Sequence, residues 1–324
     1  MGHRTEQLSS LFICPSSSGM ALYSTDVVRH LTFVIWDPMR LRTLLATYPH
    51  TAPLKNGDVT SPRVALDFKD VTPVWSGFKA MVRRQEFDVS EMAIVTYLIA
   101  KSFGKPMVLL PAVMTGRIQH AWAIYNGERG TLTPADLKGR RVGIRSFTTT
   151  TGAWLRGMFE NDYGLDLSSV RWITFEEPHV AEFVDTTERA APGKKIIPML
   201  LDGELDAVLG DRSDDRRAKS LFGDPVAAAQ AWYQKHHIVP LNHMVVVSAE
   251  LAKSRPDIVE EIYALLKEGK RRAPPPEGID TTPFGVEACR PALQRITDYV
   301  VQQRLIPRRF EVDELFDETT LKMK

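Results

Sequence analysis

Hydroxyl side chains gather in one short stretch of the sequence, where four consecutive threonines at residues 148–151 precede Gly152. The pattern predicts an apolar strand just before them, at residues 141–144, and a helix just after them, at residues 153–163. Hydroxyls and backbone N–H groups at the start of a helix favour a carboxylate or a phosphate. We therefore expect Thr149, Thr150 and the N–H groups near Gly152 to bind an anion, with simple helix capping as the alternative.

A second loop has the same position relative to its strand. Residues 86–89 predict a short strand, and residues 88–91 form the loop that follows it, with Ser90 as a candidate cap of the next helix. In open α/β sheets, ligands bind beyond the carboxyl ends of strands, where helices begin. The two loops are therefore the candidate walls of a ligand site.

The composition excludes several classes of function. The chain has 324 residues, with 41 basic and 40 acidic side chains and a formal net charge of +1. Nothing in this balance predicts binding to nucleic acid or to a membrane. The two cysteines cannot build a disulfide framework or a cysteine-based zinc site, and Cys289 is expected to be a small packed residue.

Cofactor motifs are also missing. The sequence has no HExxH pattern and no glycine-rich phosphate loop, and the adjacent pair His236 and His237 would point in different directions from a helix. We therefore expect no structural metal and no organic cofactor. A divalent ion held by histidine and carboxylate groups in the cleft is left open.

The remaining elements alternate between strands and helices, which favours mostly parallel sheets. Strands are expected at residues 31–36, 64–68, 86–89, 107–113, 121–125, 141–144, 170–174, 207–209 and 244–247. Helices are expected at residues 39–47, 73–85, from residue 90 onwards, and at residues 133–136, 153–163, 197–203 and 256–270. Two such series predict two α/β lobes, residues 29–120 with 245–324 and residues 121–244, joined by crossing segments near 121–125 and 241–247.

The first thirty residues contain no apolar run of the length that a signal peptide or a membrane span requires. Residues 1–28 are expected to form a loose extension, and the protein is expected to be cytoplasmic.

Two short patterns resemble the type 2 periplasmic binding proteins. Residues 133–143, TPADLKGRRVG, are similar to the start of the second lobe in that superfamily, and residues 203–208, GELDAV, resemble one of its strands. The resemblance implies a two-lobed fold with a central ligand cleft.

Longer matches resemble a single family, the 4,5-dihydroxyphthalate decarboxylases. They are EFDVSEM at residues 86–92, WLRG at 154–157 with Tyr163 and Gly164, PFGVEACR at 283–290, and the tail at 304–316. The resemblance covers roughly residues 30–322. It implies an enzyme that acts on an aromatic dicarboxylate and releases carbon dioxide without an organic cofactor. The implied partner is a small aromatic carboxylate, and a homo-oligomer is compatible with the resemblance.

The resemblance also implies roles for single residues. His120, His243, Glu91, Thr150 and Arg40 match the family pattern. The pattern departs around His120, where Gly116, Gln119 and Ala121 stand in place of two arginines and a serine, although Arg117 is nearby. Ser146 stands where the family tends to have an acidic residue.

Decarboxylation of a phenolic acid requires a proton on the ring carbon that loses carbon dioxide. Histidine suits this acid–base chemistry because it titrates near neutral pH. His120 and His243 are expected to face the cleft from the two crossing segments, where His120 would donate the proton. Glu91 would orient a histidine or accept the phenolic proton, with helix capping as the alternative.

The expected substrate-binding residues follow from the same resemblance and from the threonine loop: Arg40, Arg117, Ser146, Thr149, Thr150 and Gly152. The alternative function is a non-catalytic solute-binding protein for an aromatic acid or another small anion, and a third possibility is a biosynthetic enzyme of the same fold. Turnover of a hydroxylated aromatic acid would distinguish a decarboxylase from a solute-binding protein.

Overall fold

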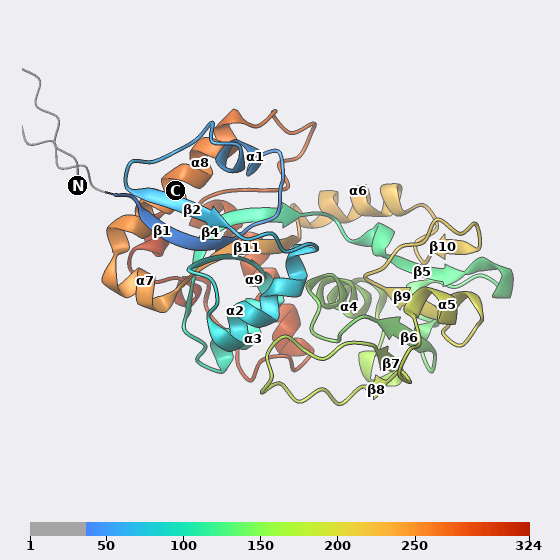
Figure 1. Cartoon of the computed structure of the whole chain (residues 1–324). Coiled ribbons are helices and arrows are strands. Elements are labelled where there is room, and N and C mark those ends of the chain that lie inside the picture. Colours follow the sequence, from blue (N-terminus) through green and yellow to red (C-terminus); the bar gives the residue numbers. More distant parts are fainter. Residues whose placement is uncertain (1–36) are drawn as a thin grey trace, which may run out of the picture. The chain divides into compact units, whose positions relative to one another are not determined.

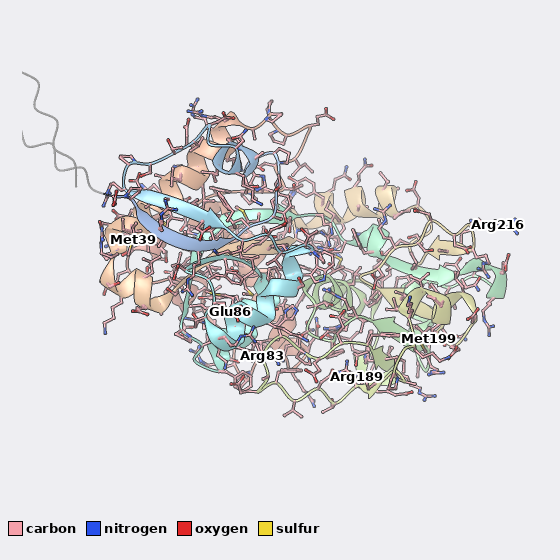
Figure 2. All side chains as sticks on the ribbon, viewed as in Figure 1. Met39, Arg83, Glu86, Arg189, Met199 and Arg216 are labelled. Carbon is pink, nitrogen blue, oxygen red and sulfur yellow. The ribbon has the colours of Figure 1, made fainter. Side chains whose placement is uncertain are left out.

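The computed structural model describes residues 37–324, which form one compact unit containing two mixed β-sheets (Figure 1). The extension expected at residues 1–28 and the strand expected at residues 31–36 lie outside the described residues. The two-sheet α/β architecture confirms the predicted fold class. Figure 2 marks both sheet regions, with Met39 in the first and Arg189 in the second.

The first sheet has the strand order β2-β1-β3-β11-β4. Its strands are β1 (Met39–Leu44), β2 (Val64–Phe68), β3 (Val89–Ala93), β4 (Met107–Gly116) and β11 (Leu241–Ser248). Strands β1, β2 and β3 are parallel, while β11 runs antiparallel to both β3 and β4. Successive side chains point to opposite faces, so Met244 joins one apolar core and Val245 joins the other.

Helices cover both faces of this sheet. They are α1 (Ala52–Lys55), α2 (Phe78–Arg84), α3 (Ile94–Ser102), α7 (Ala249–Ser254), α8 (Pro256–Arg272) and α9 (Val286–Gln302). Buried side chains of α2, α3 and α9 belong to one core, and those of α7 and α8 belong to the other. Because helices cover both faces, β3, β4 and β11 are buried along most of their length, whereas β1 and β2 also carry exposed side chains.

The second sheet has the order β10-β5-β9-β6-β7-β8. Its strands are β5 (Ala123–Asn126), β6 (Arg141–Ile144), β7 (Arg171–Thr174), β8 (Glu188–Arg189), β9 (Ala207–Leu209) and β10 (Ala218–Ser220). Its helices are α4 (Thr150–Tyr163), α5 (Ile196–Leu201) and α6 (Pro225–His236). Helix α4 packs on one face of the sheet and α5 on the other.

Short 3₁₀ turns join these elements: η1 (Val74–Gly77), η2 (His120–Trp122), η3 (Gly127–Arg129), η4 (Pro134–Leu137), η5 (Leu167–Ser169), η6 (Val312–Leu315) and η7 (Thr320–Lys322). Thr133 and Asp136 form a capping box at η4, as the sequence predicts for the start of this turn. The chain passes between the sheets twice, just before β5 and just before β11. We propose that the two lobes expected from the sequence meet at these connections.

Two assignments made from the sequence are wrong. Residues 39–47 were expected to be helical, but β1 occupies Met39–Leu44 because it finds parallel partners in both β2 and β3. The strand expected at residues 86–89 lies further along, at Val89–Ala93, and α3 starts only at Ile94. Ser90 and Glu91 are therefore buried inside a strand and do not cap a helix.

The two long C-terminal helices, α8 and α9, pack on different parts of the protein. Helix α8 packs on α1, β2 and β4, and α9 packs on α4, which covers the second sheet. Gly157 makes this last contact possible, because a Cβ atom at that position would stand 2.1 Å from a ring carbon of Tyr299. Helix α9 therefore connects the two sheet regions.

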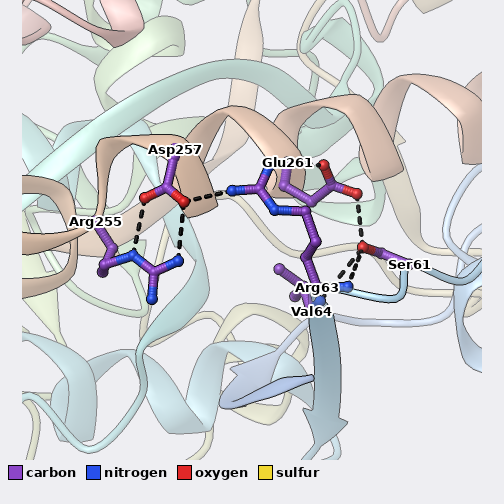
Figure 3. A network of polar contacts seen from close by, with 6 residues as sticks. All are labelled: Ser61, Arg63, Val64, Arg255, Asp257 and Glu261. Atoms are coloured by element: carbon purple, nitrogen blue, oxygen red, sulfur yellow. Dashed lines mark hydrogen bonds and ion pairs between the residues drawn. The ribbon is translucent and has the colours of Figure 1, made fainter. Parts of the chain in front are cut away.

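A polar network fixes the start of α8 beside the start of β2 (Figure 3). Ser61 donates to Glu261 at 2.6 Å, and Arg63 forms an ion pair with Asp257, which also accepts two hydrogen bonds from Arg255 at 2.9 Å each. These charged side chains are partly exposed, so the network sets the position of the helix more than it adds free energy.

Candidate active site

One cavity of about 800 Å³ is lined by residues from both sheet regions. Its walls come from the loops that follow β1, β2, β6, β7 and β9, together with η1, α3, the first residues of β11, and Thr115, Arg117 and Trp122. These loops leave the carboxyl ends of parallel strands, which is where open α/β sheets bind ligands. The position of the site therefore follows from the topology.

A histidine, a carboxylate and a phenol form the polar centre of one wall. The Nδ1 atom of His243 lies 2.6 Å from Oε1 of Glu91, and the Tyr48 hydroxyl donates to the same oxygen at 2.7 Å. The other carboxylate oxygen accepts the backbone N–H of Ala46 at 3.1 Å. Antiparallel pairing of β3 with β11 brings Glu91 and His243 onto neighbouring strands. Glu91 thus contacts a histidine, and its expected role of orienting that histidine stays a prediction.

The Glu91 side chain is completely buried. Burial alone would raise the pKa of this carboxyl group, but the hydrogen bonds from His243, Tyr48 and Ala46 outweigh it and hold the pKa below its usual value. The pKa of Tyr48 is raised by burial and by the charge of Glu91, so its hydroxyl stays protonated and donates. An ionised Glu91 requires His243 to carry a proton on Nδ1, which leaves Nε2 as the atom that can exchange a proton with a ligand.

The side of the cavity where the sequence predicts an anion lies around the start of α4. Arg117 donates to Thr151 at 3.1 Å and stacks over Trp122, 4.3 Å from the ring centre. Its Nε atom is buried and has no hydrogen-bond partner among residues 37–324, and the same holds for the hydroxyl of Thr149. Buried polar atoms normally find a partner, so Arg117 and Thr149, which both line the cavity, are candidates for binding a carboxylate.

A buried arginine supports this loop from behind. Arg156 donates to the carbonyl of Phe147 at 2.7 Å and to Gln303 of the segment after α9 at 2.9 Å. Gln303 in turn donates to the carbonyl of Ala153 at 2.8 Å. Burial lowers the pKa of Arg156 to about 9, and its guanidinium stacks on the Phe147 ring. The residues before α4 are therefore fixed before any ligand arrives.

The other residues of this loop that were predicted to bind a ligand also make contacts within the protein. Thr150 lines the cavity, but its hydroxyl accepts the backbone N–H of Val95 at 3.2 Å, near the start of α3. Ser146 lines the cavity and shares a hydrogen bond with Thr148 at 3.1 Å. Gly152 is buried behind the loop, where a Cβ atom would stand 2.1 Å from Ile144 and 2.8 Å from the Thr149 hydroxyl.

Two predicted site residues lie elsewhere. Arg40 is an exposed residue of β1 and does not line the cavity, because its strand begins at the end of the sheet opposite to the ligand. His120 is also absent from the cavity wall, so the expectation that it faces the cleft is wrong. It lies at the start of η2, on the connection between the sheets.

The His120 ring is packed among apolar groups. Its centre lies 4.3 Å from that of Phe222 and 6.4 Å from that of Trp232, and the residue is completely buried. Burial lowers the pKa of His120 to about 4, and neither ring nitrogen has a partner among residues 37–324. A neutral imidazole that does not reach the cavity cannot protonate a ligand there.

Several cavity residues were missed by sequence reasoning. Tyr48 and His179 line the cavity with Trp75 and Asp211, and burial raises the pKa of the Asp211 carboxyl group. Each of these residues lies in a loop or turn after a strand, so position beyond a strand end was the available signal. Among residues 37–324, no cluster of three His, Cys, Asp or Glu residues could hold a metal ion. No helix in this range is both long and apolar enough to cross a membrane.

Two mixed sheets with a cavity at their strand ends define a protein of the periplasmic-binding-protein type. The alkanesulfonate-binding protein SsuA of Xanthomonas axonopodis pv. citri, bound to MOPS, shares this fold with a TM-score of 0.54 and 14% identity, covering 87% of this chain and 99% of that one. The periplasmic aliphatic sulphonate-binding protein SsuA of Escherichia coli gives a TM-score of 0.53 and 13% identity over 86% and 97% of the two chains.

Sequence relatives narrow the class to a family. The 4,5-dihydroxyphthalate decarboxylase of Comamonas testosteroni is 30% identical over 234 residues, covering 67% of this chain and 71% of the relative. The enzyme of the same name from Pseudomonas putida is 29% identical over 217 residues, covering 62% and 84%. No family model matches the chain. The chain belongs to the 4,5-dihydroxyphthalate decarboxylase family.

Proposed function

We propose that this protein decarboxylates a hydroxylated aromatic carboxylic acid that resembles 4,5-dihydroxyphthalate. Family membership supports the reaction class. One observation in the site carries the proposal: His243, which is held by the buried Glu91, lines the same cavity as the half-buried, partly unpaired guanidinium of Arg117. The first group can move a proton, and the second can hold a carboxylate.

The reaction that this site would support replaces one carboxylate by hydrogen. His243 donates its Nε2 proton to the ring carbon that carries the leaving carboxylate, while a ring hydroxyl supplies electron density to that carbon. The bond between the ring and the carboxylate then breaks, carbon dioxide leaves, and the electron pair restores the aromatic ring. Solvent returns a proton to His243, and Glu91 stabilises the charged imidazole. Because the ring hydroxyl supplies the electrons, we propose that no organic cofactor or metal takes part.

The experiment that tests this function is incubation of the protein with a panel of hydroxylated aromatic acids. Carbon dioxide release and the aromatic product are measured, with and without a chelator. In deuterated water, the product should carry one deuterium at the carbon that lost the carboxylate. Tight binding of an acid without any product would instead favour a solute-binding protein. Activity that is lost on chelation and restored by one metal would contradict metal independence.

The two neighbouring threonines give a matched pair of variants for the anion subsite. Thr149→Val removes the unpaired hydroxyl of a residue that lines the cavity, and we expect it to weaken ligand binding about tenfold, the scale of a hydrogen bond to a charged group. Thr150→Val removes the acceptor of the Val95 N–H and should lower the free energy of unfolding by about 1 kcal/mol with little change in affinity. Calorimetric titration and thermal unfolding measure the two effects. The reverse pattern would assign the ligand to Thr150.

A further inference from the structure

His179 is a cavity residue that none of the motifs in the sequence includes. It lies between β7 and β8 of the second sheet, but its segment packs against the helices of the first. Arg83 of α2, which is labelled in Figure 2, donates to the carbonyl of His179 at 2.9 Å and to that of Pro178 at 2.8 Å. Lys105 pairs with Glu182 at 2.5 Å. The backbone that carries His179 is therefore held on both sides of the residue.

The imidazole ring is fixed as well. Its Nδ1 atom lies 2.9 Å from the hydroxyl of Thr96 on α3. The ring stands edge-on to Phe78 at 5.8 Å, and His243 stands edge-on to the same phenyl ring at 5.2 Å. Two histidines thus flank one aromatic side chain of the cavity wall, and all three residues line the cavity. Among residues 37–324, the His179 ring forms a hydrogen bond through Nδ1, and none is formed by Nε2.

The two histidines differ in their charged surroundings. His243 has the carboxylate of Glu91 at 2.6 Å, whereas the groups around His179 are cations. Burial, together with the charges of Arg145, Lys79, His243 and Arg83, lowers the pKa of His179 to about 3. At neutral pH this imidazole is uncharged, so it can form a hydrogen bond but does not hold a proton to donate.

We propose that His179 is a specificity-determining residue, whose Nε2 atom hydrogen-bonds a ring hydroxyl of the substrate. The inference rests on the proposed function, because it concerns the same cavity and an aromatic acid as ligand. Its ring is fixed by Thr96 and Phe78 and leaves a single polar atom for the ligand. A site built to pair with a hydroxyl rejects an analogue without one, because its own polar atom would then stay unpaired. His179 would thereby select hydroxylated rings.

Two substitutions test the roles of the two ring nitrogens of His179 separately. His179→Gln places an amide near the position of Nε2, and His179→Asn places one only near Nδ1, where it can still contact Thr96. Binding of 3,4-dihydroxybenzoate and of benzoate is measured by calorimetric titration for the wild type and both variants. We expect the wild type to prefer the dihydroxylated acid by about tenfold or more. The Asn variant should lose most of that preference, and the Gln variant should keep a large part of it.

A wild type that binds both acids equally, or neither, overturns the proposal, as does an Asn variant with undiminished preference. Equal loss in Asn and Gln, with equally lowered thermal midpoints, would show a purely structural role and also overturns it. These are binding measurements, so they do not depend on turnover. A wild type that shows the preference but releases no carbon dioxide from any acid of the activity panel would refute the decarboxylase function. The role of His179 in recognition would then stay intact.

Discussion

Replacing His243 by asparagine is expected to lower kcat by about a hundredfold or more, the scale of a lost general acid or base. The asparagine amide can still donate to Glu91 in place of Nδ1, so the buried carboxylate keeps a partner. It has no group that releases a proton near neutral pH, and the ring carbon of the substrate would stay unprotonated. Steady-state kinetics on the acid that the wild type consumes, together with the thermal midpoint, measure the effect.

His120 supplies the matched control. It is also a buried histidine, but it packs against Phe222 and Trp232 outside the cavity. We expect His120→Asn to retain nearly the wild-type kcat per folded molecule, with any loss confined to stability. Full turnover in the His243 variant, or an equal loss of turnover in both variants, would remove His243 from the proposed mechanism.

The second large effect concerns Glu91. Replacing it by alanine is expected to lower the free energy of unfolding by about 3–5 kcal/mol, the cost of removing one member of a buried charged pair. His243, Tyr48 and the N–H of Ala46 would all lose their acceptor inside the protein. Glu91→Gln keeps the shape and one carbonyl oxygen, so we expect a smaller loss of stability. Both variants should lose turnover, because the charged imidazole is no longer stabilised.

The pH dependence of stability tests the charge of Glu91 directly. The folded protein holds the pKa of this group below its ordinary value of 4.5. The carboxylate therefore contributes stability that is fully present above about pH 4.5 and is lost as the pH falls through the lower, folded-state pKa. The difference in thermal midpoint between the wild type and Glu91→Gln should narrow as the pH is lowered from 7 towards 3. A difference that stays constant over this range would mean that Glu91 is not the titrating group.

Local sequence patterns predicted the bounds of an element correctly where residues within or next to that element mark its ends. The strand β2 and the strand β6 have the bounds that the sequence predicts, and η4 begins at its capping box. The strand β1 was misassigned because its six residues, MRLRTL, are too few for their periodicity to decide between a helix and a strand, and its pairing with β2 and β3 settles the assignment. Strand β3 extends to Ala93 for the same reason, since β11 pairs with it along that length.

The candidate site was predictable in part. Glu91 and His243 were found through the family resemblance, and the threonine loop was found through its place between a strand and a helix. The contact between Glu91 and His243 joins residues that are 152 positions apart, so no local pattern contains it. His120 was placed correctly on the connection between the sheets, but the direction of its side chain depends on the aromatic cluster of Phe222 and Trp232.

The groups of this site are divided between the two sheets, and this division has an evolutionary consequence. The carboxylate, histidine and phenol proposed to handle the proton come from the first sheet and the loop after β1, whereas the threonines and His179 come from loops of the second. Sequence changes in the second-sheet loops can therefore alter which ring substituents are accepted without disturbing proton transfer. A family built in this way can diversify its substrates by exchanging loops in one half while inheriting its chemistry unchanged in the other.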